Sequence, residues 1–149
     1  MPTRPDELAQ LVTDHLAAQT FSEVVTVSRA YRPRVDRAAM EGTVITVVPR
    51  SAEDTLSSRA IVARDIEIDV AVQARLTGQP HSERDADIDQ LMFLVSEVGN
   101  ALRGVQQGPT QWKAQRNDPI YAPEHLDQHE VFTSLITVTY RTALMIGGS

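Results

Sequence analysis

A chain of 149 residues with 42% hydrophobic and 23% charged residues has the composition of one globular domain, which excludes disorder throughout. The formal net charge of −6 argues against a protein that wraps nucleic acid, because phosphate binding needs concentrated lysine and arginine. The absence of cysteine excludes disulfides and thiolate chemistry, and no apolar run approaches the about 20 residues of a membrane-spanning helix. We therefore expect a single domain over residues 1–149, without a signal peptide and kept in a cytoplasm.

The first part of the chain predicts a helix followed by two strands. Proline and two acids open a helix over about residues 5–18, where apolar residues recur at helical spacing. Alternating side chains predict a strand over residues 21–31 and a short second strand over residues 43–48. Pro49 is expected to end that strand, and residues 50–58 are expected to form a polar connection.

The middle of the chain carries the clearest pattern, and we expect the fold to be organised around it. Apolar side chains occupy every second position from Ile66 to Leu76, which predicts a strand over residues 64–76 with one face on a core and one in water. The spacing then changes to that of a helix over residues 84–103. The apolar stripe of this helix can pack on the apolar face of the strand.

The last part of the chain predicts a long irregular segment and a final strand. Residues 105–128 are interrupted by glycine and proline, and a loop of this length is usually functional or mobile. Residues 130–146 predict a long strand. Together the elements predict an α+β fold, with a mostly antiparallel, twisted β-sheet of about four to five strands and two main helices packed on one face.

The segment before the final strand holds the arrangement that most resembles a catalytic site. His125, Asp127 and His129 could bind one metal ion, as in a small metal-dependent hydrolase, if this turn were helical. No glutamate follows the first histidine as it does in an H-E-x-x-H motif, and Pro123 leaves little room for a helix. We therefore predict an exposed polar approach to the strand, with no metal site, no cofactor and no catalytic residue.

Two charged segments are candidate contact surfaces. The arginine loop consists of Arg29, Arg32, Arg34 and Arg37, and the acidic helix start consists of Glu83, Asp85, Asp87 and Asp89. Each has an ordinary explanation, namely a solvated loop for the arginines and complementarity to the helix dipole for the acids. The sharper hypothesis is a subunit interface in which the arginine loop meets the acidic helix start of a neighbouring copy. Head-to-tail rings need such opposite patches at different places on one subunit.

The order of the elements adds a resemblance to a known family. A helix comes first, followed by a strand that runs into a loop of arginine and proline, and then by a short strand at residues 44–49. After a polar link come the strand at residues 66–70, the helix with the acidic start and the strand at residues 132–141. This order resembles the tail-terminator and minor-tail (tail completion) proteins of long-tailed bacteriophages and prophages. The resemblance spans most of the chain but rests on pattern, so it carries no functional residue over.

The resemblance implies a structural role without enzymatic activity. Such proteins form a ring, typically a hexamer, on the end of the tail tube, stop tube polymerisation and present a surface for the head connector. The implied partners are further copies of the chain, the tail tube protein and the head connector protein, with DNA only passing through the lumen and no membrane involved. Copies of the chain either form the ring in solution or stay monomeric when free and oligomerise only on the tube. The implied location is the virion tail, and the bacterial host cytoplasm during assembly.

The sequence leaves two matters open within this interpretation. A head–tail connector or head-closure protein of the same virion is the nearest alternative function, and the metal-dependent hydrolase is the alternative from another class. The water-facing side of the sheet either lines the lumen or lies outside it. That side is expected to present Glu67, Asp69, Gln73, Arg75, Thr137, Thr139 and Arg141.

Overall fold

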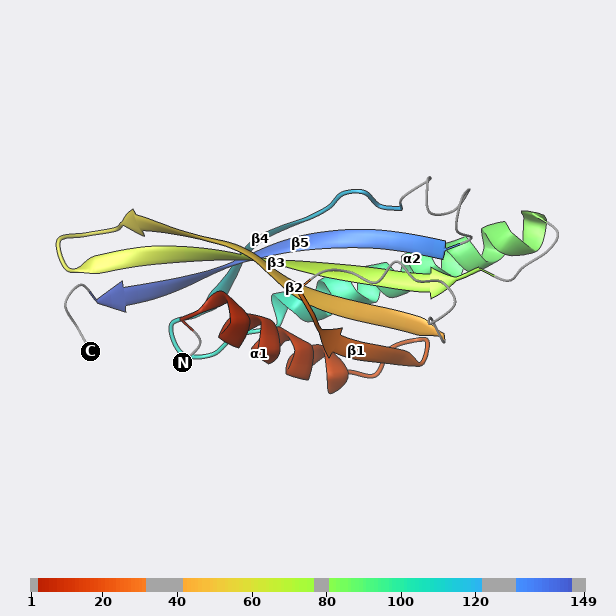
Figure 1. The fold of residues 1–149 in the computed structure, drawn as a ribbon, viewed down its shortest axis with the longest axis horizontal. Coiled ribbons are helices and arrows are strands. Elements are labelled where there is room, and N and C mark those ends of the chain that lie inside the picture. The colour runs from red at the N-terminus through yellow and green to blue at the C-terminus, as the bar shows by residue number, and fades with distance from the viewer. Residues whose placement is uncertain (1–2, 32–41, 77–80, 122–130, 146–149) are drawn as a thin grey trace.

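The structure is a computed structural model that describes residues 3–31, 42–76, 81–121 and 131–145, with residues 81–84 described by their backbone alone. Its elements form an α+β fold, which confirms the predicted class (Figure 1). In chain order they are α1 (Pro5–Ala17), β1 (Val25–Arg29), β2 (Thr43–Leu56), β3 (Ile61–Arg75), α2 (His81–Arg103), β4 (Gln111–Asn117) and β5 (Val131–Met145).

The strands form one twisted sheet with the order β1-β2-β3-β5-β4 (Figure 1). β1 runs parallel to β2, and the other neighbouring pairs are antiparallel. β3 is the central strand, as its clean alternation predicts, and it pairs along its whole length with β5. The mostly antiparallel sheet of the prediction is therefore confirmed.

Both helices pack on the same face of the sheet and share one hydrophobic core with it. The apolar face of β3, which includes Ile66, Ile68 and Val70, is fully buried in this core. The buried residues of α1 and α2 belong to the same cluster. Near the helix ends, the buried Tyr140 hydroxyl of β5 donates a hydrogen bond of 2.6 Å to the carbonyl of Leu102. The periodic residues of the sequence thus build a two-layer domain.

The start of α1 follows from local sequence. Pro5 occupies the first turn, where its missing amide hydrogen costs no hydrogen bond. The Glu7 carboxylate accepts a hydrogen bond of 3.3 Å from the backbone amide of Arg4, which closes the helix end. At the other end, His15 Nε2 lies 3.0 Å from the Ala101 carbonyl and ties α1 to α2.

Three strand predictions need correction. β1 is shorter than residues 21–31, β2 does not end at Pro49, and β4 lies inside the segment that was expected to be irregular. The pairing of β2 with β3 shifts register between Pro49 and Ser51, so the proline sits at an irregularity where the ladder tolerates a missing donor. β4 is an edge strand with mostly exposed side chains, and so it lacks the apolar alternation that marks a buried strand.

The side of the sheet opposite the helices is not exposed throughout, which also corrects the prediction. Gln73 is only 1% exposed and Thr137 only 4%. Val44 lies opposite Gln73 across the β2–β3 pair and forms a small second apolar cluster with Val131. The pattern of β3 alone could not reveal this, because the apolar neighbours belong to other strands. The rest of this side faces water as predicted. Glu67, Asp69 and Thr139 are partly exposed there, and Arg75 and Arg141 are exposed.

Candidate assembly surfaces

The most distinctive feature is a three-stranded extension at one end of the sheet, which we call the arm (Figure 1). It consists of residues 51–56 of β2, 61–65 of β3 and 141–145 of β5, which remain paired to their ends. All the arm residues of β2 are exposed, in contrast to the buried first half of that strand. The arm therefore extends past the hydrophobic core that the helices cover.

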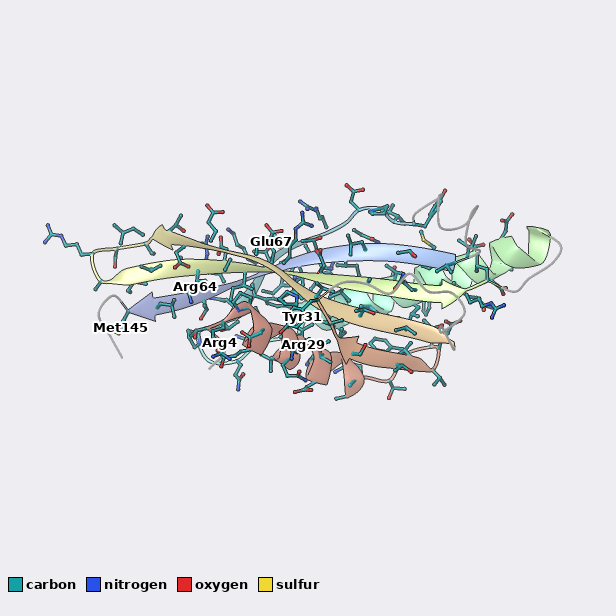
Figure 2. The ribbon with its side chains drawn as sticks, in the orientation of Figure 1. Arg4, Arg29, Tyr31, Arg64, Glu67 and Met145 are labelled. Carbon is teal, nitrogen blue, oxygen red and sulfur yellow. The ribbon has the colours of Figure 1, made fainter. Side chains whose placement is uncertain are left out.

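The free end of the arm is apolar on both faces. Leu56 and Met145 are each 71% exposed and Ile61 is 39% exposed. Ile61 pairs with Met145 across β3 and β5, whereas Leu56 lies opposite Val62 on the other face of the strands. Met145 projects at this end in Figure 2. Exposed apolar side chains gathered at the free end of such an extension make it a candidate contact surface.

The turn at the end of the arm carries a single charge. The chain turns over residues 57–60, where the Ser57 amide donates a hydrogen bond of 2.9 Å to the Ile61 carbonyl. Arg59 is exposed in this turn, and its neighbours Ser57, Ser58 and Ala60 are uncharged. The tip of the arm thus carries one cation in a turn that the apolar residues Leu56 and Ile61 flank.

Charged groups hold the base of the arm on the helix side of the sheet. The Arg64 guanidinium donates to both Asp54 carboxylate oxygens, at 2.7 and 2.9 Å, and to the Thr3 carbonyl at 2.9 Å. Arg64, itself an arm residue, lies near the start of α1 in Figure 2. Its hydrogen bonds and charge lower the pKa of Asp54.

A second charge cluster holds the base on the opposite side of the sheet. Arg141 Nε and Lys113 Nζ lie 2.8 and 2.6 Å from the two carboxylate oxygens of Asp65. The hydrogen bond from Arg141, with a further one from Lys113, lowers the pKa of Asp65 to about 2. The cluster joins β3, β5 and β4, so the arm leaves the body of the sheet from a braced position.

Next to this cluster, the charges of the exposed sheet face are also paired. Arg50 lies 3.7 Å from a carboxylate oxygen of Glu67 and 3.4 Å from one of Asp69. The Thr137 hydroxyl donates a hydrogen bond of 2.8 Å to Asp69. These carboxylates and the Arg50 guanidinium offset each other's charge, which leaves a face of mixed charge.

A groove lies between α2 and the loop that precedes β1. This Phe93 groove has a volume of about 480 Å³ and is lined by Ser22, Glu23, Asp89, Gln90 and Phe93. Phe93 is 61% exposed, because it lies off the stripe of α2 that faces the core. A neighbouring hollow of about 370 Å³ shares Ser22 and Glu23 and also includes Val24, which is 95% exposed.

The Phe93 groove is preformed by contacts from Glu97. This carboxylate accepts a hydrogen bond of 3.1 Å from the Ser22 amide and another from the Ser22 hydroxyl. Asp89, Phe93 and Glu97 are spaced four residues apart and therefore line one side of α2. The loop is thus fastened to the same helix face that presents the exposed aromatic ring.

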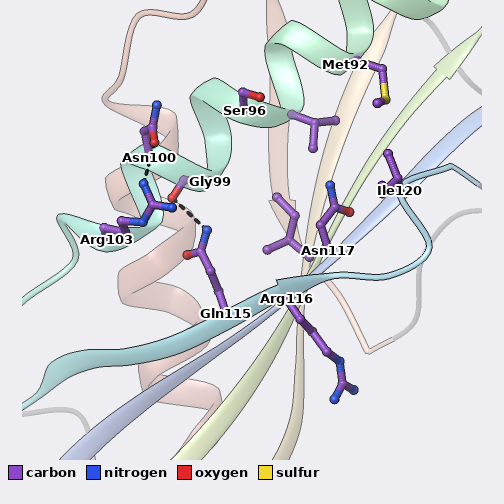
Figure 3. A pocket seen from close by; sticks show the side chains of 11 residues that line it. Met92, Ser96, Gly99, Asn100, Arg103, Gln115, Arg116, Asn117 and Ile120 are labelled. Carbon is purple, nitrogen blue, oxygen red and sulfur yellow. Dashed lines mark hydrogen bonds between the residues drawn. The ribbon is translucent and has the colours of Figure 1, made fainter.

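A third hollow, of about 430 Å³, lies between α2 and β4 (Figure 3). Gln115 crosses it, since its Nε2 donates to the Gly99 carbonyl at 3.2 Å and its Oε1 accepts from Trp112 Nε1 at 2.9 Å. Arg103 donates to Asn100 at 2.7 Å. The Gln115 hydrogen bond to Gly99 ties β4 to α2, whereas the Arg103–Asn100 hydrogen bond lies within α2. Within the described ranges, no group of three His, Cys, Asp or Glu side chains gathers to hold a metal ion.

Comparison of the chain with protein-family models and with curated proteins gave no match. Of the helices in the described residues, neither has the length and apolar character needed to cross a membrane.

The structure describes only part of the two charged segments predicted as an interface. Arg32, Arg34 and Arg37 lie outside the described residues, as does the side chain of Glu83. Arg29 is exposed and held against α1, with its Nε donating to Gln10 at 3.1 Å and its guanidinium lying 5.6 Å from the centre of the Tyr31 ring (Figure 2). Asp85, Asp87 and Asp89 lie in the first turns of α2, at the end of the molecule opposite the arm (Figure 1).

The three residues of the metal site considered from the sequence lie outside the described residues, namely His125, Asp127 and His129. Sequence reasoning missed the apolar arm tip and Phe93. Leu56 was a signal, since it is a large apolar residue inside a segment predicted to be a polar connection. Phe93 was another, because it falls between the positions of the apolar stripe of its helix.

Proposed function

We propose that this protein is a non-enzymatic assembly subunit that forms a ring on the end of a phage or prophage tail tube. In this role it ends tube polymerisation and provides the surface on which the head docks. The observation that carries the proposal is the arm, which exposes apolar side chains on both faces beyond the core. Strands without a covering layer gain little from burial in a free subunit, so such a surface favours contact with another protein.

The distribution of charge supports the same function. A channel for DNA should not bind phosphates strongly, and the net charge of −6 together with the paired charges of the exposed sheet face suits that requirement. The arm and the acidic helix start lie at opposite ends of the molecule (Figure 1). Different surfaces at different ends favour a head-to-tail contact, which closes into a ring when the rotation between copies allows it.

The proposal is tested by adding the purified protein to tail tube protein, encoded by the same genome, while the tubes polymerise. We expect shorter tubes that carry a ring at one end in electron micrographs, because the subunit occupies the growing end. Binding to the head connector but not to the tube would favour the connector alternative. Unchanged tube lengths, with no added density at either end, would contradict the terminator function.

A further inference from the structure

We infer that the tip of the arm docks into the Phe93 groove of a second copy of the same chain, so that copies join head to tail. This inference rests on the proposed assembly function and names the surfaces that would carry it. The arm ends at one side of the molecule, whereas the acidic turns of α2 lie at the other (Figure 1). One copy therefore cannot satisfy its own groove with its own arm, and a neighbour is the natural occupant.

The first reason is that the two surfaces match in hydrophobicity. The arm tip offers Leu56, Ile61 and Met145, which are all substantially exposed in the free subunit. The groove offers the exposed ring of Phe93, and Val24 extends the apolar surface beside it. Burying these side chains against each other removes apolar area from water at both ends of the contact.

The second reason is that the two surfaces have opposite charge. Arg59 is the only charged residue in the turn at the arm tip. Glu23 and Asp89 are carboxylates in the groove lining, and the described lining contains no cation. A guanidinium pairs with carboxylates through directed hydrogen bonds, so Arg59 would set the orientation of the arm in the groove.

The third reason is that both surfaces are formed before they meet. The Arg64–Asp54 pair braces the arm, and the Glu97–Ser22 hydrogen bonds hold the wall of the groove. Association then costs less ordering entropy than the docking of a flexible loop would. The contact uses different surfaces on the two copies, so it propagates from subunit to subunit until a ring closes.

The docking can be tested by disulfide cross-linking, because the chain has no cysteine of its own. One preparation carries Ser58→Cys at the arm tip and the other carries Gln90→Cys in the groove lining, both at exposed positions. After mixing and mild oxidation we expect a disulfide between the two preparations. Such a bond forms only when the two Cα atoms come within about 7 Å, so it reports close contact. In the matched control, the second preparation carries Gln106→Cys and not Gln90→Cys. Gln106 is exposed and lies beyond the other end of α2.

Charge and apolar variants test the same contact without oxidation. Arg59→Glu is expected to weaken self-association about tenfold or more, as measured by sedimentation, because it places like charges together. Combining it with Asp89→Arg should restore part of the loss. Leu56→Asp is expected to weaken association at least about as much, because it places a charge in the apolar contact. Arg116→Glu makes the same charge change at an exposed position on β4 and should leave association unchanged.

The outcomes separate the docking from the proposed function. Cross-linking of Ser58→Cys with Gln90→Cys, and not with Gln106→Cys, supports the docking. Self-association without that cross-link, or with equal cross-linking to the control, overturns the docking and leaves the ring function standing. Lack of any self-association up to about 1 mM subunit also overturns it, because the contact would then be weaker than a specific interface requires. The ring function is decided separately, by the lengths and ends of tail tubes that polymerise in the presence of the protein.

Discussion

At the scale of single residues, Asp65 is the group whose ionisation contributes most clearly to the fold. It accepts hydrogen bonds from Arg141 and Lys113 and has a pKa of about 2 instead of the ordinary 3.8. A carboxylate whose pKa is lower in the folded state stabilises the protein above its unfolded pKa. That stabilisation is lost as the pH falls from about 4 to about 2, where the folded carboxylate becomes protonated.

Asp65→Asn is therefore expected to lower the free energy of unfolding at pH 7 by about 1 to 2 kcal/mol, a value reduced for the solvent exposure of the partners. The variant should also lose less stability than the parent between pH 4 and pH 2. Urea unfolding followed by circular dichroism measures both effects. The control is Glu53→Gln, which neutralises the exposed residue opposite Asp65 on β2. Equal sensitivity to acid in the parent and the Asp65 variant would contradict the assignment.

At the scale of elements, the sequence reveals those that contribute a periodic face to the core. The stripe of β3 and the change to helical spacing in α2 were predictable because burial selects apolar residues at fixed intervals. The second half of β2 and the whole of β4 were not, because most of their side chains face water. The Phe93 groove was not predictable as a site either, since Glu97 and Ser22 are far apart in the sequence.

The arm should also differ from the rest of the sheet in its dynamics. Its amides are paired but lie outside the hydrophobic core, so local opening costs less free energy than in the buried centre of β3. In the free subunit we expect amide hydrogen exchange at Val62 to be at least about 100-fold faster than at Val70. In the assembled ring the difference should shrink. Equal protection of both residues in the free subunit would contradict an independently opening arm.

At the scale of the whole molecule, two head-to-tail contacts are now distinct hypotheses. The arginine loop and the arm tip both bring cations to the acidic region of a neighbouring α2, but they do so from different segments of the chain. Reversing charge at Arg34 and Arg37 is expected to weaken self-association more than folding, if the arginine loop forms an interface. Sedimentation of that double variant beside Arg59→Glu shows which of the two contacts contributes more to self-association. The unfolding midpoints of both variants serve as the control for folding. Unchanged association of the double variant would remove the arginine loop from the interface.

The register break in β4 has a consequence for how such a long sheet stays in solution. Pairing with β5 shifts between Trp112 and Ala114, and the intervening Lys113 reaches over the sheet to Asp65. A bulge and a charged side chain at an open edge disrupt the regular row of amides and carbonyls that another strand would need. The β4 edge is thereby discouraged from pairing with the edge of another copy and from starting a fibril of stacked sheets.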